Sequence, residues 1–119
     1  MNIVHAASEL FPFMKTGGLA DAVGGLTKAL AAAGHEVTVF LPGYRSALEH
    51  PDADSAERVH RLQVEMGGRY LNADLLRLRL SPRYTVYLVK RDEFFDRRGA
   101  YGTNERDYDD NAERFIFFS

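Results

Sequence analysis

The first 43 residues alternate strand-like and helix-like patterns, and this alternation constrains the fold more than any other feature. Short apolar runs occupy residues 3–7 and 37–41. Between them, apolar residues recur at helical spacing: Leu19, Val23, Leu26, Leu30 and Ala33. Such a strand–helix–strand unit, with nearly continuous apolar strands, is typical of a parallel sheet covered by helices on both faces. The sequence therefore predicts the α/β class, as a three-layer sandwich.

The second half of the chain predicts an inserted β-hairpin and one more strand. Strand-like segments at 58–66 and 69–80 flank Gly67-Gly68, and two glycines suit a tight hairpin turn. A further apolar strand is expected at 85–89. Residues 50–55 are predicted as a loop because they include Pro51, Asp52 and Asp54. Residues 94–108 are predicted as loop-like because Gly, Asn and charged residues are frequent there.

A final helix is expected to begin at Asp110. Glu113 follows three residues later, which is the spacing of a capping box. The helix then continues into the apolar run 115–118, where the sequence stops. Because chain ends are usually polar and frayed, we expect these residues to be a piece of a longer protein.

Composition excludes several classes of function. The 119 residues suit a single domain, and the absence of cysteine excludes disulfides and thiol chemistry. A net charge of −2 argues against a nucleic-acid partner. No apolar stretch approaches the roughly 18 residues of a membrane span, and the first residues lack the basic region of a signal peptide. We therefore expect a cytoplasmic protein with no membrane partner.

No metal site is predicted. Residues 107–111 resemble a calcium loop, but Ala112 stands where the turn needs glycine and Phe118 where it needs a bidentate glutamate. The four histidines show no ligand spacing.

The glycine loop Lys15-Thr16-Gly17-Gly18 is the main candidate site. It lies between the first strand and the first helix, where backbone N–H groups are unpaired and the helix dipole favours an anion. Lys15 adds a mobile positive charge. Phosphate or pyrophosphate is the natural ligand. The alternative is a tight turn with a solvated lysine, and the spacing alone leaves both open.

Familiar phosphate motifs do not explain this loop. In the Walker A motif the lysine follows the glycines, whereas Lys15 precedes them. The Gly-x-Gly-x-x-Gly fingerprint and its acidic partner are absent, which disfavours a nicotinamide dehydrogenase. Gly24-Gly25 lies within the helix, where we expect it to permit close packing against another backbone.

Several motifs together resemble the N-terminal region of bacterial glycogen synthases and plant starch synthases. The most specific is the heptad Lys-Thr-Gly-Gly-Leu-Ala-Asp at residues 15–21. The resemblance extends along the chain, and weakens between about residues 46 and 66. It is carried further by Ala7-Ser8-Glu9, Gly34-His35, Leu41-Pro42-Gly43-Tyr44, Phe95-Asp96-Arg97, Tyr101-Gly102 and Asp110-Asn111-Ala112-Glu113-Arg114-Phe115.

The resemblance implies a retaining glucosyltransferase with two Rossmann-like domains. Such enzymes move glucose from ADP-glucose, a substrate and not a cofactor, to the non-reducing end of an α-1,4-glucan. By resemblance, Lys15 contacts the donor phosphates and the Gly17-Gly18 main chain lies beside them. Asp21 faces the cleft, as a possible catalytic residue that orients a sugar hydroxyl or Lys15. The helix dipole explains a first-turn carboxylate at Asp21 equally well. Tyr101 matches a tyrosine near the donor nucleotide.

The same resemblance implies that residues 1–119 are the N-terminal part of the catalytic domain. The C-terminal Rossmann-like domain, with the cationic groups that bind the leaving diphosphate, is missing. We therefore expect this segment to be inactive alone, and the choice between ADP-glucose and UDP-glucose to depend on the missing domain. The alternative is a stand-alone, non-catalytic module that binds a sugar phosphate or glucan.

Overall fold

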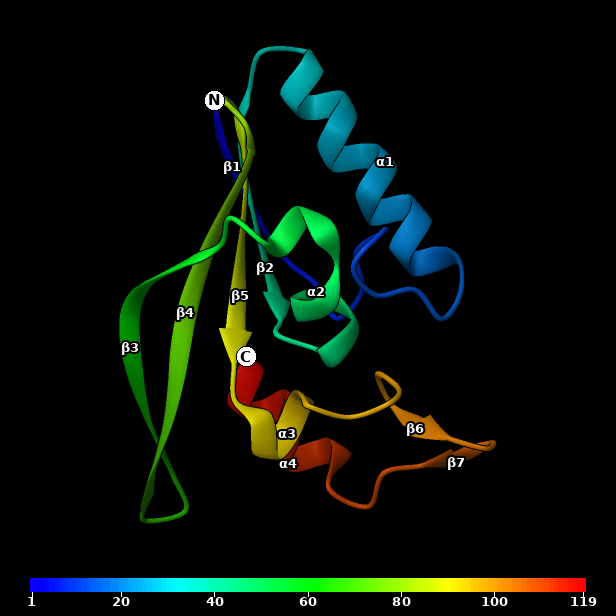
Figure 1. The fold of residues 1–119 in the computed structure, drawn as a ribbon, viewed down its shortest axis with the longest axis vertical. Coiled ribbons are helices and arrows are strands. Elements are labelled where there is room, and N and C mark those ends of the chain that lie inside the picture. Colours follow the sequence, from blue (N-terminus) through cyan, green and yellow to red (C-terminus); the bar gives the residue numbers. More distant parts are fainter.

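A computed structural model describes residues 1–119 and shows a five-stranded sheet with helices around it (Figure 1). The strand order is β1-β2-β5-β4-β3. The strands are β1 (Asn2–Ala6), β2 (Glu36–Pro42), β3 (Glu57–Met66), β4 (Arg69–Ser81) and β5 (Tyr84–Lys90). No helix is long and apolar enough to cross a membrane.

The predicted strand–helix–strand unit is confirmed. Strands β1 and β2 pair in parallel, and helix α1 (Gly18–Ala32) connects them. Gly34 follows the helix with φ of 98°, a left-handed conformation that glycine adopts without steric cost. Strand β5 then pairs in parallel with β2.

The predicted hairpin is also confirmed, and it makes the sheet mixed. Gly67 and Gly68 have φ of 58° and 78°, as a tight turn between twisted strands requires. Strands β3 and β4 pair antiparallel, and β4 pairs antiparallel with β5. The hairpin therefore extends the parallel strands on one side.

Short elements lie within and beside the two regions that were predicted as loops, and the predicted final helix follows the second. Helix α2 (Arg45–Glu49) and a 3₁₀ turn (Pro51–Ala53) precede β3. Helix α3 (Asp92–Phe95) follows β5, and the small strands β6 (Gly102–Thr103) and β7 (Arg106–Asp107) precede helix α4 (Asn111–Phe118). These elements are too short to produce a clear periodicity in the sequence.

The buried face of α1 differs from the predicted stripe. Its buried residues are Ala20, Gly24 and Thr27. Of the predicted stripe, Val23 and Leu30 are partly buried against the core, whereas Leu19 and Leu26 are 47% and 50% exposed. A Cβ at Gly24 would lie 3.4 Å from the Phe11 carbonyl oxygen, so small residues let the helix approach this backbone closely. The packing reason expected for the glycine pair therefore holds at Gly24, while Gly25 is exposed and unconstrained.

Helix α1 covers one face of the sheet, where the Thr27 and Tyr84 hydroxyls lie 2.7 Å apart. On the opposite face Val4 is 64% exposed, and the stacked rings of Phe40 and Tyr87 are partly exposed. The described residues therefore build the sheet and one covering layer of the predicted sandwich.

Helix α4 packs its aromatic residues inward. Phe117 is buried against Phe94, at a ring separation of 5.4 Å, and Phe115 is partly buried against Phe95. Only Ile116 of the apolar run is strongly exposed. The run at 115–118 is thus part of the core.

Candidate functional site

The glycine loop lies where the parallel strands end. Residues 7–17 connect β1 to α1, and residues 15–17 are the last part of this connection. Helices α3 and α4 and the strands β6 and β7 gather at the carboxyl end of β5 (Figure 1). In open α/β sheets, ligands bind at the carboxyl ends of the strands. The loop is therefore placed where a ligand site is expected.

Lys15 and Asp21 face each other at the surface of this site. The Lys15 Nζ lies 2.6 Å from Asp21 Oδ2, and both side chains are about half exposed. Asp21 belongs to the first turn of α1, where the helix dipole favours a carboxylate. The same carboxylate thus lies in the first turn of α1 and pairs with Lys15.

Gly17 and Gly18 are exposed, and the fold does not require glycine at either position. Gly17 is extended, with φ of −168°, and a Cβ added at either residue would meet no atom within 4 Å. The backbone N–H groups of Gly18 and Leu19 precede the hydrogen-bonded part of α1 and donate to no protein acceptor. The absence of side chains leaves these donors accessible to an anion.

Glu9 connects the glycine loop to Tyr101. Glu9 is only 4% exposed, and its carboxylate accepts hydrogen bonds from the Thr16 N–H and from the Tyr101 hydroxyl, each at 2.8 Å. Burial raises the pKa of Glu9, but these hydrogen bonds outweigh burial and hold the pKa below its ordinary value. Glu9 is therefore an ionised, buried acceptor between two segments.

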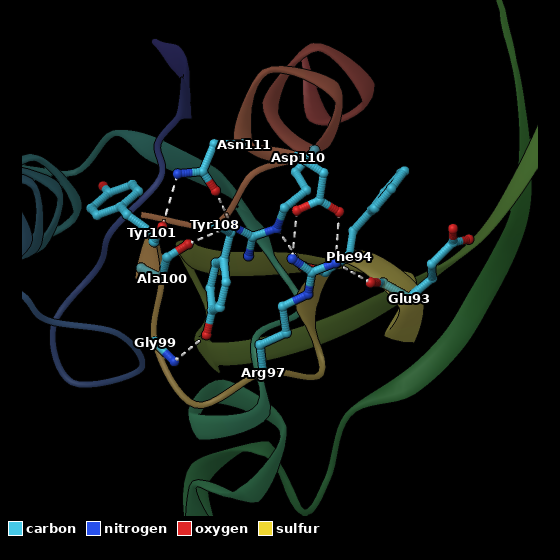
Figure 2. Close-up of polar contacts among 10 residues, drawn as sticks. Glu93, Phe94, Arg97, Gly99, Ala100, Tyr101, Tyr108, Asp110 and Asn111 are labelled. Carbon is cyan, nitrogen blue, oxygen red and sulfur yellow. Dashed lines mark hydrogen bonds and ion pairs between the residues drawn. The ribbon is translucent and has the colours of Figure 1, made fainter. Parts of the chain in front are cut away.

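Both the side chain and the backbone of Tyr101 are fixed by hydrogen bonds. Its hydroxyl lies 2.7 Å from Ser8 Oγ, and burial raises the pKa of this hydroxyl. The Tyr101 carbonyl accepts from Asn111 Nδ2 and from the Tyr108 N–H, each at 2.8 Å (Figure 2). The predicted binding residue is thus fixed beside the glycine loop.

Arg114 connects the segments around this site through hydrogen bonds to three residues. Its guanidinium is fully buried and donates to the carbonyls of Phe94 and Ala100 and to Asn111 Oδ1, at 2.6–2.9 Å. No carboxylate pairs with it, and the Tyr108 ring lies 4.9 Å from its guanidinium carbon. Burial lowers the pKa of Arg114.

The predicted capping box is wrong. Asp110 precedes α4 but caps no N–H with its side chain, because both its oxygens accept from Arg97, at 2.6 and 2.7 Å. Glu113 pairs with Arg69 on β4. Charged partners elsewhere in the fold therefore replaced the local cap.

Asp110 makes a testable contribution to acid stability. Hydrogen bonds from Arg97 hold the pKa of Asp110 below its ordinary value, so the unfolded chain binds a proton more readily. The resulting stabilisation is complete above the ordinary pKa and is lost as the pH falls through the folded value. We expect Asp110→Asn to show a smaller loss of stability between about pH 5 and about pH 2 by urea denaturation. The exposed Asp109→Asn is the control, and identical acid profiles for Asp110→Asn and the unmodified chain would contradict this account.

The structure thus brings together all five predicted site residues through one residue whose role sequence reasoning missed. Lys15, Gly17, Gly18 and Asp21 form the loop and first turn, and Glu9 joins them to Tyr101. A charged residue three positions after the first strand, within the Ala7-Ser8-Glu9 motif, was the available signal. No group of three potential metal ligands occurs in the described chain.

Known proteins resemble this chain over nearly all of its length. The family model described as the starch synthase catalytic domain matches residues 2–119. A glycogen synthase of Opitutus terrae is 62% identical over 118 residues, which are 99% of this chain and 25% of that protein. A glycogen synthase of Syntrophotalea carbinolica is 44% identical, covering 99% of this chain and 24% of that protein.

A solved structure shares the fold. It is the catalytic domain of starch synthase IV from Arabidopsis thaliana, bound to ADP and acarbose. The TM-score is 0.80 at 28% sequence identity, covering 98% of this chain and 23% of that chain. The chain therefore spans about a quarter of the length of the proteins it matches.

Proposed function

This chain belongs to the starch synthase catalytic domain family, and on that premise we propose that it supplies half of the donor site of a retaining glucosyltransferase. The complete protein would transfer glucose from ADP-glucose to the non-reducing end of an α-1,4-glucan. The sugar nucleotide is itself the activated substrate, so the proposed reaction needs no cofactor. We place the protein in the cytoplasm, as the sequence led us to expect.

The observation that carries the proposal is the pair Gly17 and Gly18. Neither has a positive φ or a neighbour that excludes a side chain, yet both lie at the N-terminus of α1 beside Lys15. Their backbone can therefore be approached closely by a phosphate oxygen, which a side chain would obstruct. The ADP bound to the related starch synthase IV supports a nucleotide ligand for this fold.

Each site residue has a proposed role in this reaction. Lys15 binds the donor phosphates once its ion pair with Asp21 rearranges, and Asp21 then orients the lysine or a sugar hydroxyl. The main chain at Gly17 and Gly18 binds the phosphate beside the transferred glucose. Tyr101 lies near the donor nucleotide. These roles follow from the family resemblance together with the placement of the residues on one edge of the sheet.

The rest of the donor site must come from outside residues 1–119. A departing diphosphate needs several positive groups, and Lys15 is the one lysine on the glycine loop. We propose that these residues are the N-terminal part of a catalytic domain whose second Rossmann-like domain supplies the remaining cations. This segment alone would then transfer no glucose.

Radiolabelled glucose transfer tests the proposal. We expect the complete protein that contains this segment to move label from ADP-glucose into glycogen, while the 119-residue chain does not. A complete protein that binds glycogen but transfers no label would contradict the proposal and favour the non-catalytic module. Transfer by the isolated chain would contradict the need for a second domain.

A further inference from the structure

Outside α1, the glycine loop makes its hydrogen bonds to Glu9, to which the Thr16 and Gly17 backbone both turn. The Thr16 N–H donates at 2.8 Å to Glu9 Oε1. The partner of Lys15 is Asp21, which belongs to α1. The position of the loop relative to other segments therefore depends on Glu9.

The second oxygen of Glu9 binds a framework that is itself fixed. Oε2 accepts from the Tyr101 hydroxyl, and the Tyr101 backbone is held by Asn111 and Tyr108 (Figure 2). Arg114 holds the adjacent Ala100 carbonyl. The Glu9 carboxylate thus joins an exposed loop to the well-anchored segment 99–101.

A carboxylate suits this bridge better than any neutral side chain. Both oxygens accept, one from an N–H and one from an O–H, whereas the amide of glutamine offers one acceptor and two donors. Glu9 forms no ion pair with any residue of the chain, so charge pairing does not explain its burial. A surface hollow lined by Thr16 and residues 99–107 lies beside the bridge.

We propose that Glu9 is a positioning residue of the donor site, which holds the glycine loop at a fixed place relative to Tyr101. Glu9 acts through Thr16 and Tyr101 and does not contact the reacting atoms. The inference rests on the proposed function. Loss of Glu9 should lower kcat/KM for the donor, because the glycine loop would no longer be held at a fixed position relative to Tyr101.

The test uses the complete protein with Glu9→Gln, and Glu49→Gln as the matched control on the exposed face of α2. We expect Glu9→Gln to lower kcat/KM for ADP-glucose by about tenfold. The KM for glycogen should stay close to the unmodified value. The Tm should fall modestly, because the change alters a buried acceptor that receives two hydrogen bonds. Tyr101→Phe removes the hydroxyl at the other end of the bridge. Because both changes break the Glu9–Tyr101 contact, the double variant should lose no more kcat/KM for ADP-glucose than the more impaired of the two single variants.

Each outcome decides the inference. An unchanged kcat/KM for ADP-glucose in Glu9→Gln, or losses that multiply in the double variant, would overturn the positioning role. A variant that loses Tm but retains donor kinetics would show that Glu9 is only structural. If Glu9→Gln does not fold, Tyr101→Phe decides alone, and unchanged donor kinetics there overturn the role. Failure of the proposed function is distinguishable, because the unmodified protein would then transfer no glucose.

Discussion

Replacing Arg114 with methionine is expected to lower the free energy of unfolding by about 3–5 kcal/mol. Methionine retains much of the apolar length of the side chain but removes every donor. The carbonyls of Phe94 and Ala100 and the Asn111 side-chain oxygen then lose a partner in a place that water does not reach. Removal of one buried charge offsets only part of this loss. A small domain loses much of its total stability by such a change.

The effect is checked by urea denaturation followed by circular dichroism. Arg106→Met is the matched control, because the Arg106–Asp109 pair is 3.6 Å long and both side chains are more than four-fifths exposed. We expect the control to change stability by less than about 0.5 kcal/mol. A loss of less than about 1 kcal/mol in Arg114→Met would show that the buried guanidinium does not organise this region.

Local patterns in the sequence were sufficient to predict the order of the main elements. Short apolar runs located the parallel strands, and period-3.6 spacing located α1. Gly34 and Gly67-Gly68 located the chain reversals. These features depend on neighbouring residues, which a single sequence displays directly. The exclusion of thiol chemistry is equally direct, because it depends only on the absence of cysteine.

Tertiary contacts explain what the sequence patterns missed. The buried face of α1 depends on the approach of Phe11 to Gly24. The glycine pair predicted a close approach, but neither it nor the apolar stripe identified the partner or the buried face. Asp110 binds Arg97 instead of capping α4, because a guanidinium with two donors lies within reach. In both cases a partner from another segment overrode a local preference.

In the candidate site, too, contiguous residues could be recognised from the sequence and contacts between distant segments could not. The glycine loop was recognisable because its residues are contiguous, and the heptad carried the family resemblance. The Glu9–Tyr101 hydrogen bond joins residues 92 positions apart, and no spacing rule connects them. The role of Arg114 could not be predicted, because two of its partners are backbone carbonyls, which every residue has.

A methyl group at Gly18 is expected to lower kcat/KM for ADP-glucose on the order of 100-fold in the complete protein. The fold accepts the methyl group, because a Cβ there meets no atom within 4 Å and alanine favours the helix. In the proposed donor site, the methyl group would occupy the surface that the donor phosphate approaches, and would therefore weaken donor binding. Gly25→Ala is the matched control, since Gly25 is also exposed in α1 with no neighbour within 4 Å.

The most direct test of the donor-loop assignment is therefore the initial rate of glucose transfer from ADP-glucose to glycogen by these two variants. The account predicts that both variants fold at least as stably as the unmodified protein, that Gly25→Ala retains full activity, and that Gly18→Ala loses nearly all of it. A Gly18→Ala variant with unchanged transfer would contradict the claim that this loop binds the donor phosphate.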